Sequence, residues 1–547
     1  MSQAHGTTSQ RRGVAAAGTV LRVALGALLL LAIVVLPNDW GRVIARPDPS
    51  LPLEWVAALG LLLVLPRRAA GIACALVVAA AGALLFIKLA DMGTGVAFAR
   101  PFNPILDLHL FVSGWHLLSG SVGVGQAVLA IGLALLVFFA ALLALGWGLR
   151  GLEKWPSASR RAPGFALLLL AAIGAVLVHR GHAPFANAQA TRFAVERADI
   201  LQRGFRDLAE FETLLDDDPA RALSGPGLLQ RLEGKDVLFL FVESYGRSAV
   251  EGERYADAVR DRLAGIEAGI GDAGFAARSG WLTAPTVGGQ SWLAHAALLS
   301  GLWVDKQQRY ERLMVSERPS LNRIFKEAGW RTVGVMPAIT MDWPEARWYG
   351  YDTTYVRDNL GYRGDPFNWV TMPDQFTLKA MQRFELDSGN RAPVMAEVSL
   401  ISSHAPWTPI PPLLPWNAIG DGTVFNPHAN SGDPPDVVWR DHERVRDQYA
   451  LSIDYALETI GSYIETFGTD DLVLVVLGDH QPASIVTGPG ASWDVPVHLI
   501  AADPDVLEAI DDWNWTPGLI PDADAPVMGM DKFRERFLRA FSEPALG

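Results

Sequence analysis

Two hydrophobic patterns divide the chain. Before residue 180, long apolar stretches rich in Ala, Leu, Val and Gly follow one another with few charged residues between them. A helix needs about 20 residues to cross a bilayer core of about 30 Å. Five stretches reach or approach that length, at 20–37, 51–66, 69–88, 122–148 and 163–179. Residues 1–180 are therefore predicted to form a transmembrane domain of five helices.

The basic residues between these stretches predict their orientation. Arg11 and Arg12 precede the first span, Arg67 and Arg68 separate the second and third, and four more basic residues lie between the fourth and fifth. Lys and Arg are enriched in cytoplasmic loops. We therefore expect a multi-pass protein of the cytoplasmic (inner) membrane, with its N-terminus in the cytoplasm and everything after residue 180 outside. The four apolar stretches after the first exclude a cleavable signal peptide.

The second half has a different pattern, in which short apolar runs alternate with amphipathic segments. The strand-like runs are 237–242, 331–336, 392–401, 472–477 and 495–502, and helices are expected near 252–272 and 443–467. This alternation predicts an α/β domain with a central, mostly parallel, doubly wound sheet and helices on both faces. We assign this extracytoplasmic domain to residues 226–547 and an amphipathic connector to residues 181–225.

The composition narrows the classes of function. The net charge is -13 and no basic patch stands out, which argues against binding to nucleic acid. Cys74 is the single cysteine and lies in an apolar run, so the chain has no internal disulfide and no cysteine-based zinc site. An extracytoplasmic domain of this chain must depend on core packing for its stability.

Polar residues with metal-binding capacity follow two of the predicted strands. Glu243 comes directly after the run 237–242, and Asp479 and His480 come just after the run 472–477. Open α/β sheets place their ligands beyond the carboxyl ends of the strands. Carboxylate and imidazole groups can share one divalent cation. The pattern therefore predicts a metalloenzyme.

A candidate nucleophile lies between these two strands in the sequence. Gly288-Gly289 predicts a turn, and a helix is expected to begin near Ser291. A hydroxyl at a helix N-terminus beside a cation is well placed to attack, because the cation and the helix dipole both favour its anion. Two alternatives remain open: Ser291 as a simple helix cap, and Thr286 or Thr283 as the nucleophile.

The order of these elements resembles the alkaline phosphatase/sulfatase superfamily. The segment 297–301, Ala-Leu-Leu-Ser-Gly, is similar to the segment that follows the sulfatase nucleophile, and counting back ten residues as in that family lands on Ser291. Leu293 and His295 stand where sulfatases carry Pro and Arg. Conversion of the nucleophile to formylglycine is therefore not expected, and an unmodified serine favours phosphorus chemistry.

With its amino-terminal spans, the chain resembles most the lipoteichoic acid synthase and phosphoethanolamine transferase branch. The resemblance implies one divalent metal ion, Mn²⁺ or Zn²⁺, with these ligands: Glu243, Ser291, Asp479 and His480. It implies that His404, in Ser-His-Ala-Pro at 403–406, contacts the substrate. Other substrate-binding residues implied by the resemblance are Trp343, Arg347 and His295.

The reaction implied by this resemblance transfers a phospho-alcohol head group, of the phosphoglycerol or phosphoethanolamine type. Ser291 attacks a phospholipid donor, diacylglycerol leaves, and the covalent seryl intermediate passes the head group to a glycan or glycolipid acceptor. His404 is suited to act as general acid or base near neutral pH. One alternative is a membrane-tethered hydrolase of phosphate or sulfate esters. Another is a non-catalytic membrane sensor, which the intact ligand set disfavours.

Overall fold

The computed structural model describes residues 4–39, 50–98, 100–103, 107, 110–182, 185–220, 225, 227–389 and 391–542. The chain forms two compact units. The first comprises residues 1–95, 100–115 and 123–205, and the second comprises residues 96–99, 116–122 and 206–547. The predicted domain boundary at residues 225 and 226 adjoins residues 221–224 and 226, which lie outside the described residues.

The first unit consists of apolar helices. The helices before residue 220 are α1 (Ala4–Val35), α3 (Leu53–Val64), α4 (Arg67–Phe98), α5 (Leu110–Val122), α6 (Val124–Leu149), α7 (Ser157–His179) and α8 (Gln189–Asp216). Two short strands, β1 (Leu51–Pro52) and β2 (Ala186–Asn187), pair in parallel. Helix α8 forms most of the predicted connector.

Four of the five predicted spans are confirmed as helices of membrane-spanning length. Within the described residues, these helical segments are Ala17–Val35, Arg67–Ala97, Val124–Lys154 and Ser159–His179. The second prediction, 51–66, corresponds to α3, which has only 12 residues. At about 1.5 Å per residue α3 is about 18 Å long, which is shorter than a bilayer core. Pro52 and Pro66 bound it, because proline disfavours a helix at the residue before it.

Glycines allow close approach between helices of this unit. A Cβ atom added to Gly148 of α6 would lie 2.6 Å from the Cα of Gly26 in α1. A Cβ atom added to Gly164 of α7 would lie 2.8 Å from the Cβ of Leu63 in α3. Small residues at helix crossings are typical of helices that pack in lipid, where close van der Waals contact replaces the hydrophobic driving force.

The second unit contains one large mixed sheet. Its strands are β3 (Asp236–Val242), β4 (Ala276–Thr283), β5 (Arg331–Met336), β6 (Thr353–Val356), β7 (Val394–Leu400), β8 (Leu472–Gly478), β9 (Asp494–Ala501), β10 (Thr516–Pro517) and β11 (Val527–Gly529). The strand order is β10-β4-β9-β8-β3-β7-β5-β6, and β11 also pairs with β4. Strands β8, β3, β7, β5 and β6 are mutually parallel, which confirms the predicted α/β fold.

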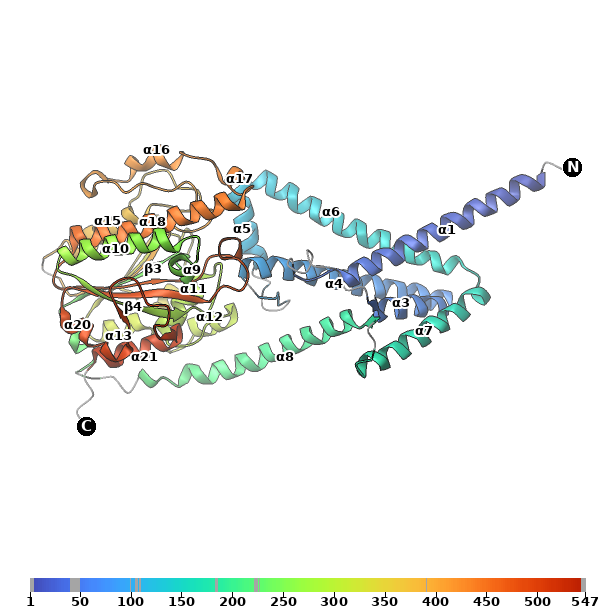
Figure 1. Ribbon diagram of the computed structural model, residues 1–547, viewed down its shortest axis with the longest axis horizontal. Helices are drawn as coiled ribbons and strands as arrows, with labels where there is room; N and C mark the ends of the chain where they lie inside the picture. Colours follow the sequence, from blue (N-terminus) through green and yellow to red (C-terminus); the bar gives the residue numbers. More distant parts are fainter. Residues whose placement is uncertain are drawn as a thin grey trace. The chain divides into compact units, whose positions relative to one another are not determined.

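Helices surround this sheet. The longer ones are α10 (Ala256–Asp272), α11 (Ser291–Ser300), α12 (Gln307–Met314), α13 (Leu321–Glu327), α15 (Asp374–Met381), α18 (His442–Phe467) and α21 (Met530–Phe541). The shorter ones are α9 (Arg247–Glu251), α14 (Ala346–Tyr349), α16 (Asn426–Ala429), α17 (Pro435–Val438), α19 (Ser484–Thr487) and α20 (Pro504–Glu508). Figure 1 shows α10, α15 and α18 on one face of the sheet and α13 and α21 on the other.

The central strand β3 is buried on both faces, as its unbroken apolar run predicts. Leu238, Leu240 and Val242 belong to the core that also includes residues of α10 and α18. Val237, Phe239 and Phe241 belong to the core that includes residues of α11, α13 and α21. Because side chains alternate along a strand, one continuous apolar run supplies both cores.

Two features of the sheet differ from a simple βα alternation. Strand β9 runs antiparallel to β8, because the short segment between them contains no helix long enough to return the chain for a parallel crossover. Strand β4 was not predicted, since Arg278, Ser279 and Gly280 interrupt its apolar pattern. It pairs antiparallel with β9 along its whole length.

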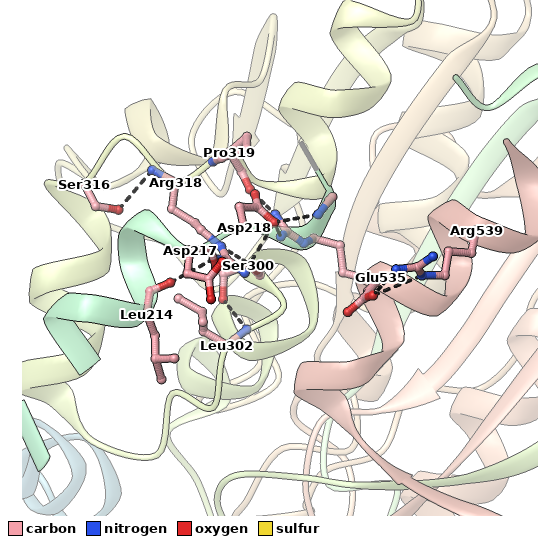
Figure 2. Close-up of polar contacts among 12 residues, drawn as sticks. Leu214, Asp217, Asp218, Ser300, Leu302, Ser316, Arg318, Pro319, Glu535 and Arg539 are labelled. Carbon is pink, nitrogen blue, oxygen red and sulfur yellow. Dashed lines mark hydrogen bonds and ion pairs between the residues drawn. The ribbon is translucent and has the colours of Figure 1, made fainter. Parts of the chain in front are cut away.

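Buried charges fix the end of α8 to the second unit. Figure 2 shows Asp218 close to Arg318, and the closest approach of the two side chains is 3.5 Å. Arg534 of α21 also forms an ion pair with Asp218. Arg318 donates to the carbonyl oxygens of Leu214 and Asp217 at 2.9 and 2.6 Å. All three charged side chains are buried, so the chain after α8 is held by one ionic cluster.

Replacing Asp218 with Asn is expected to destabilise the second unit by about 3–5 kcal/mol, because the buried Arg318 and Arg534 then lose the carboxylate that pairs with both of them. Asp447→Asn is the matched control, since Asp447 pairs with Arg254 on the surface and its side chain is 64% exposed. The control substitution is expected to lower the free energy of unfolding by less than about 1 kcal/mol. Denaturant unfolding followed by tryptophan fluorescence measures both variants. An equal loss in the two would contradict the role given to Asp218.

Candidate metal and nucleophile site

The parallel register of β3 and β8 brings two carboxylates together. Val242 pairs with Gly478, so Glu243 and Asp479 follow at the same level of neighbouring strands. Gly478 is required here, because a Cβ atom added to it would lie 1.8 Å from the carbonyl oxygen of Tyr245. The backbone N–H of Ser244 donates to Asp479 Oδ1 at 2.8 Å. The chain after β3 therefore turns directly over the end of β8.

Three buried ligand residues meet at this point. One ligand atom from each of Glu243, Asp479 and His480 lies within 4.8 Å of the other two. His480 Nε2 is 3.4 Å from Glu243 Oε1 and 3.6 Å from Asp479 Oδ2. Two carboxylates and one imidazole, all nearly inaccessible to solvent, form a donor set that suits a divalent cation.

The carbonyl oxygen of Gln481 sets the tautomer of His480. His480 Nδ1 lies 2.9 Å from this oxygen. A carbonyl only accepts, so Nδ1 carries the proton and Nε2 presents its lone pair to the cluster. The same oxygen accepts the N–H of Gly288 at 2.8 Å. One backbone acceptor thus orients a ligand and anchors the loop before the candidate nucleophile.

Ser291 is the first residue of α11 and reaches the cluster with its hydroxyl. Its Oγ donates to Glu243 Oε2 at 3.0 Å and lies 3.3 Å from His480 Nε2. Gln290 before it has a left-handed backbone, with φ of 65°. The rival hydroxyls are bonded elsewhere: Thr286 donates to the carbonyl of Gly289, and Thr283 donates to Asp494, both at 2.8 Å. The geometry therefore favours Ser291 as nucleophile.

The electrostatics of the cluster also suit a cation. Burial raises the pKa of Asp479 well above its ordinary value, and the negative charge of Glu243 adds to the rise. Burial also acts to raise the pKa of Glu243, but the nearby imidazoles of His404 and His480 and the hydrogen bond from Ser244 act in the opposite direction, and the net shift of this pKa is downward. Two neighbouring buried carboxylates cannot both be ionised without a nearby positive charge. The residues present therefore fit a divalent ion.

His404 lies in a loop that begins at the end of β7 and is linked to the cluster. Ser403 Oγ donates to the backbone carbonyl of Glu243 at 2.5 Å. His404 Nδ1 is 2.5 Å from the carbonyl of Ala405, which leaves Nε2 as the nitrogen available to a substrate. The indole of Trp369 stacks on the imidazole, with ring centroids 6.1 Å apart.

Asp374 is a site-supporting residue that the sequence did not indicate. It is the first residue of α15 and fully buried. Its Oδ1 accepts the N–H groups of Ile401 and Ser402 at 2.7 and 3.0 Å, just before His404. An acidic residue in the first turn of a helix is the only local signal, and it does not identify partners that are 27 residues away.

The other predicted substrate-binding residues differ in their surroundings. His295 of α11 is buried, stacks on Phe241 and bonds to Glu397. Trp343 packs against Tyr349 and Tyr351. Arg347 of α14 is exposed. Within the part of the chain that the structure describes, no hydrogen bond, ion pair or ring contact joins Trp343 or Arg347 to the three candidate ligands or to Ser291.

Comparison with known proteins gave matches among solved structures only. Scans against family models and curated proteins gave no match. The lipoteichoic acid synthase LtaP from Listeria monocytogenes is 14% identical over 58% of this chain and 74% of that chain, with a TM-score of 0.39. The phosphoglycerol transferase GacH from Streptococcus pyogenes, in complex with sn-glycerol-1-phosphate, is 12% identical over 61% and 80%, with a TM-score of 0.36.

A further match is a protein in the alkaline phosphatase superfamily from Vibrio parahaemolyticus. It is 16% identical over 53% of this chain and 65% of that chain, with a TM-score of 0.36. At such identities and TM-scores, the functional argument rests on the residues of this chain.

Replacing Asp479 with Asn is expected to weaken the binding of Zn²⁺ and Mn²⁺ by more than about 100-fold. Loss of a residue that hydrogen-bonds to a metal ligand typically lowers metal affinity by about 10- to 100-fold, and loss of a ligand itself is expected to cost more. Calorimetric titration of the metal-free protein measures the affinity. Asp374→Asn is the matched control, as it neutralises a buried carboxylate outside the cluster and is expected to keep the metal affinity. Wild-type affinity in Asp479→Asn would place the metal elsewhere.

The stability of the protein is expected to respond to the titration of Asp374. Burial raises its pKa to about 7, so its contribution to stability is fully present below the unfolded value of about 3.9 and is lost as the pH rises through about 7. With a metal chelator present, the free energy of unfolding of the wild type is expected to fall between pH 5 and pH 8, relative to that of Asp374→Asn, by on the order of 3 kcal/mol. Denaturant unfolding at both pH values measures this, and parallel behaviour would contradict it.

Proposed function

We propose that this protein is a membrane-anchored, metal-dependent phosphotransferase. It moves a phospho-alcohol head group from a phospholipid to a glycan or glycolipid through a covalent intermediate on Ser291. The observation that carries the proposal is the position of the Ser291 hydroxyl. It lies at a helix N-terminus within hydrogen-bonding distance of both Glu243 and His480, inside a buried three-ligand cluster. That combination is typical of an activated nucleophile.

Glu243, Asp479, His480 and Ser291 would hold one divalent ion, Mn²⁺ or Zn²⁺. The donor set of two carboxylates, one imidazole and one hydroxyl suits either metal. A bound ion supplies Lewis-acid polarisation of phosphoryl oxygens and a lowered pKa for a coordinated hydroxyl. The Gln481 carbonyl supports the ligand role of His480, because it keeps the proton on Nδ1.

The proposed chemistry has two displacements at one phosphorus atom. First, Ser291 Oγ bonds to the phosphorus of a head-group phosphodiester and the bond to the diacylglycerol oxygen breaks. The hydroxyl proton leaves along the hydrogen bond to Glu243, and His404 protonates the departing oxygen. Second, an acceptor hydroxyl attacks the same phosphorus and gives its proton to His404. The bond from phosphorus to Oγ then breaks, and Ser291 regains its proton.

The remaining predicted residues take supporting roles in this proposal. His404 is the general acid and base, since its Nε2 is the nitrogen not bonded to Ala405. His295 contacts the phosphoryl group from the middle of α11. Trp343 and Arg347 contribute to the wall of the substrate site on the side of α14.

The membrane unit has a physical purpose in this function. Its apolar helices keep the catalytic unit beside a bilayer, where the lipid donor is concentrated. We propose that the protein lies in the cytoplasmic membrane with its N-terminus inside and its catalytic unit outside. The excess of basic residues at the predicted cytoplasmic ends supports this orientation.

The full-length protein in detergent, loaded with Mn²⁺ or Zn²⁺, is to be incubated with a panel of fluorescent phospholipids. The wild type is expected to release diacylglycerol and to gain the mass of a phospho-alcohol on the intact protein. Ser291→Ala is expected to lack this mass and to be at least about 1000-fold slower, because it lacks the nucleophile.

Thr286→Ala is the matched control, since Thr286 is the rival hydroxyl in the same loop, and it is expected to keep the covalent mass. If the mass appears in Ser291→Ala but not in Thr286→Ala, the assignment of the nucleophile is wrong. If simple phosphate or sulfate esters are hydrolysed and no phospholipid is cleaved, the transferase proposal is replaced by the hydrolase.

A further inference from the structure

Another buried carboxylate, outside the three-ligand cluster, has no part in the chemistry described so far. Glu397 of β7 is fully buried. It accepts hydrogen bonds from His295 Nδ1 at 2.6 Å, from the Tyr351 hydroxyl at 2.6 Å and from Asn322 Nδ2 at 3.0 Å. Among the described residues, none of these donors is a lysine or an arginine. Burying a carboxylate without such a partner lowers the stability of the folded state, and an apolar residue in its place would usually make the core more stable.

The sheet register defines the direction in which His295 points. Glu397 pairs with Phe239, which places it two residues before Phe241 and four before Glu243 along the parallel strands. The His295 ring stacks on Phe241, with centroids 3.7 Å apart and planes at 16°. Its Nδ1 is directed back toward Glu397. The two ring nitrogens of an imidazole point in roughly opposite directions, so Nε2 is directed toward the carboxyl ends of the strands.

The helix α11 carries both His295 and the candidate nucleophile. His295 is four residues after Ser291, and residues separated by four lie on the same face of a helix. Ser291 touches Glu243 and His480. The imidazole of His295 therefore lies between the Glu397 carboxylate and the cluster, one helical turn below the nucleophile.

We propose that Glu397 is a positioning residue that acts through His295. Its carboxylate holds Nδ1 and thereby keeps Nε2 directed at the phosphoryl group during transfer. This proposal rests on the phosphotransferase function and adds a residue to it. Orientation of a histidine by a buried carboxylate is a general way to fix both its tautomer and its direction. The effect of Glu397 is therefore expected on phosphate binding and turnover, with no effect on binding of the metal.

The test uses the full-length protein in detergent and three variants: Glu397→Gln, His295→Gln and the double variant. Inorganic phosphate is titrated calorimetrically into each protein after loading with Zn²⁺, and Zn²⁺ affinity is measured separately. Both single variants are expected to bind phosphate about 10-fold more weakly with unchanged Zn²⁺ affinity, an effect typical of an orienting partner. The double variant is expected to lose no more than either single variant, because Glu397 acts through His295.

Glu385→Gln is the matched control. Glu385 is another buried carboxylate, and it accepts hydrogen bonds from Arg331 at 2.6 and 2.9 Å and from Tyr355 at 2.7 Å, away from the cluster. The Glu385→Gln protein is expected to be less stable than the wild type and to bind phosphate with the same affinity. On any ester that the wild type cleaves, Glu397→Gln is expected to lower kcat/KM by about 10- to 100-fold, with part of the loss appearing as a higher KM.

Three outcomes would overturn the proposal. They are an unchanged phosphate affinity in Glu397→Gln, additive losses in the double variant, and an equal loss in Glu385→Gln. If Glu397→Gln does not fold, His295→Gln still decides whether the imidazole contacts phosphate. If the wild type binds Zn²⁺ and phosphate but cleaves no phospholipid, the phosphotransferase proposal fails, and the phosphate titrations still decide the role of Glu397.

Discussion

Two carboxylates buried side by side are the constraint on which the site depends. The parallel register of β3 and β8 places Glu243 and Asp479 at the same level, and the turn after β3 keeps both away from solvent. Like charges in such a position repel each other, and burial deprives them of solvation. A bound cation would remove both costs, and His480 would complete its ligand set with the lone pair on Nε2, because the Gln481 carbonyl holds the proton on Nδ1. The ion would thereby balance the charge of two carboxylates that lie at the ends of buried, apolar strands.

Helix α11 joins this cluster to the rest of the second unit. Its N-terminus carries Ser291 above the ligands, and its middle carries His295 over Phe241. At its C-terminal end, the carbonyl of Ser300 accepts a hydrogen bond from Arg318 at 3.0 Å. Arg318 also binds the backbone at the end of α8, so the helix of the candidate nucleophile and the connector share one buried cation. The position of the candidate nucleophile thus depends on contacts at both ends of α11.

Most of the fold was predictable because its signals are local. Burial can be read directly from the sequence of several elements. Examples are the unbroken apolar runs of β3 and β8, the amphipathic periodicity of α10 and α18, and the long apolar spans. The direction of β9 was not predictable in this way, since it depends on the length of the connection from β8. Strand β4 was missed because its burial comes from β9 and the elements around it, while its own residues include Arg278 and Gly280.

By itself, the sequence determined the candidate ligand residues Glu243, Asp479 and His480 and the candidate nucleophile Ser291, which the structure brings together. Each directly follows a strongly patterned strand or begins a helix, and parallel strands bring their carboxyl ends to one edge. Only the tertiary structure decided which distant groups hold the site in place. Glu397 is 102 residues from His295, and Asp374 is 27 residues from Ile401. Hydrogen bonds between residues so far apart leave no periodic trace in the sequence, because they arise only when strands and helices are packed.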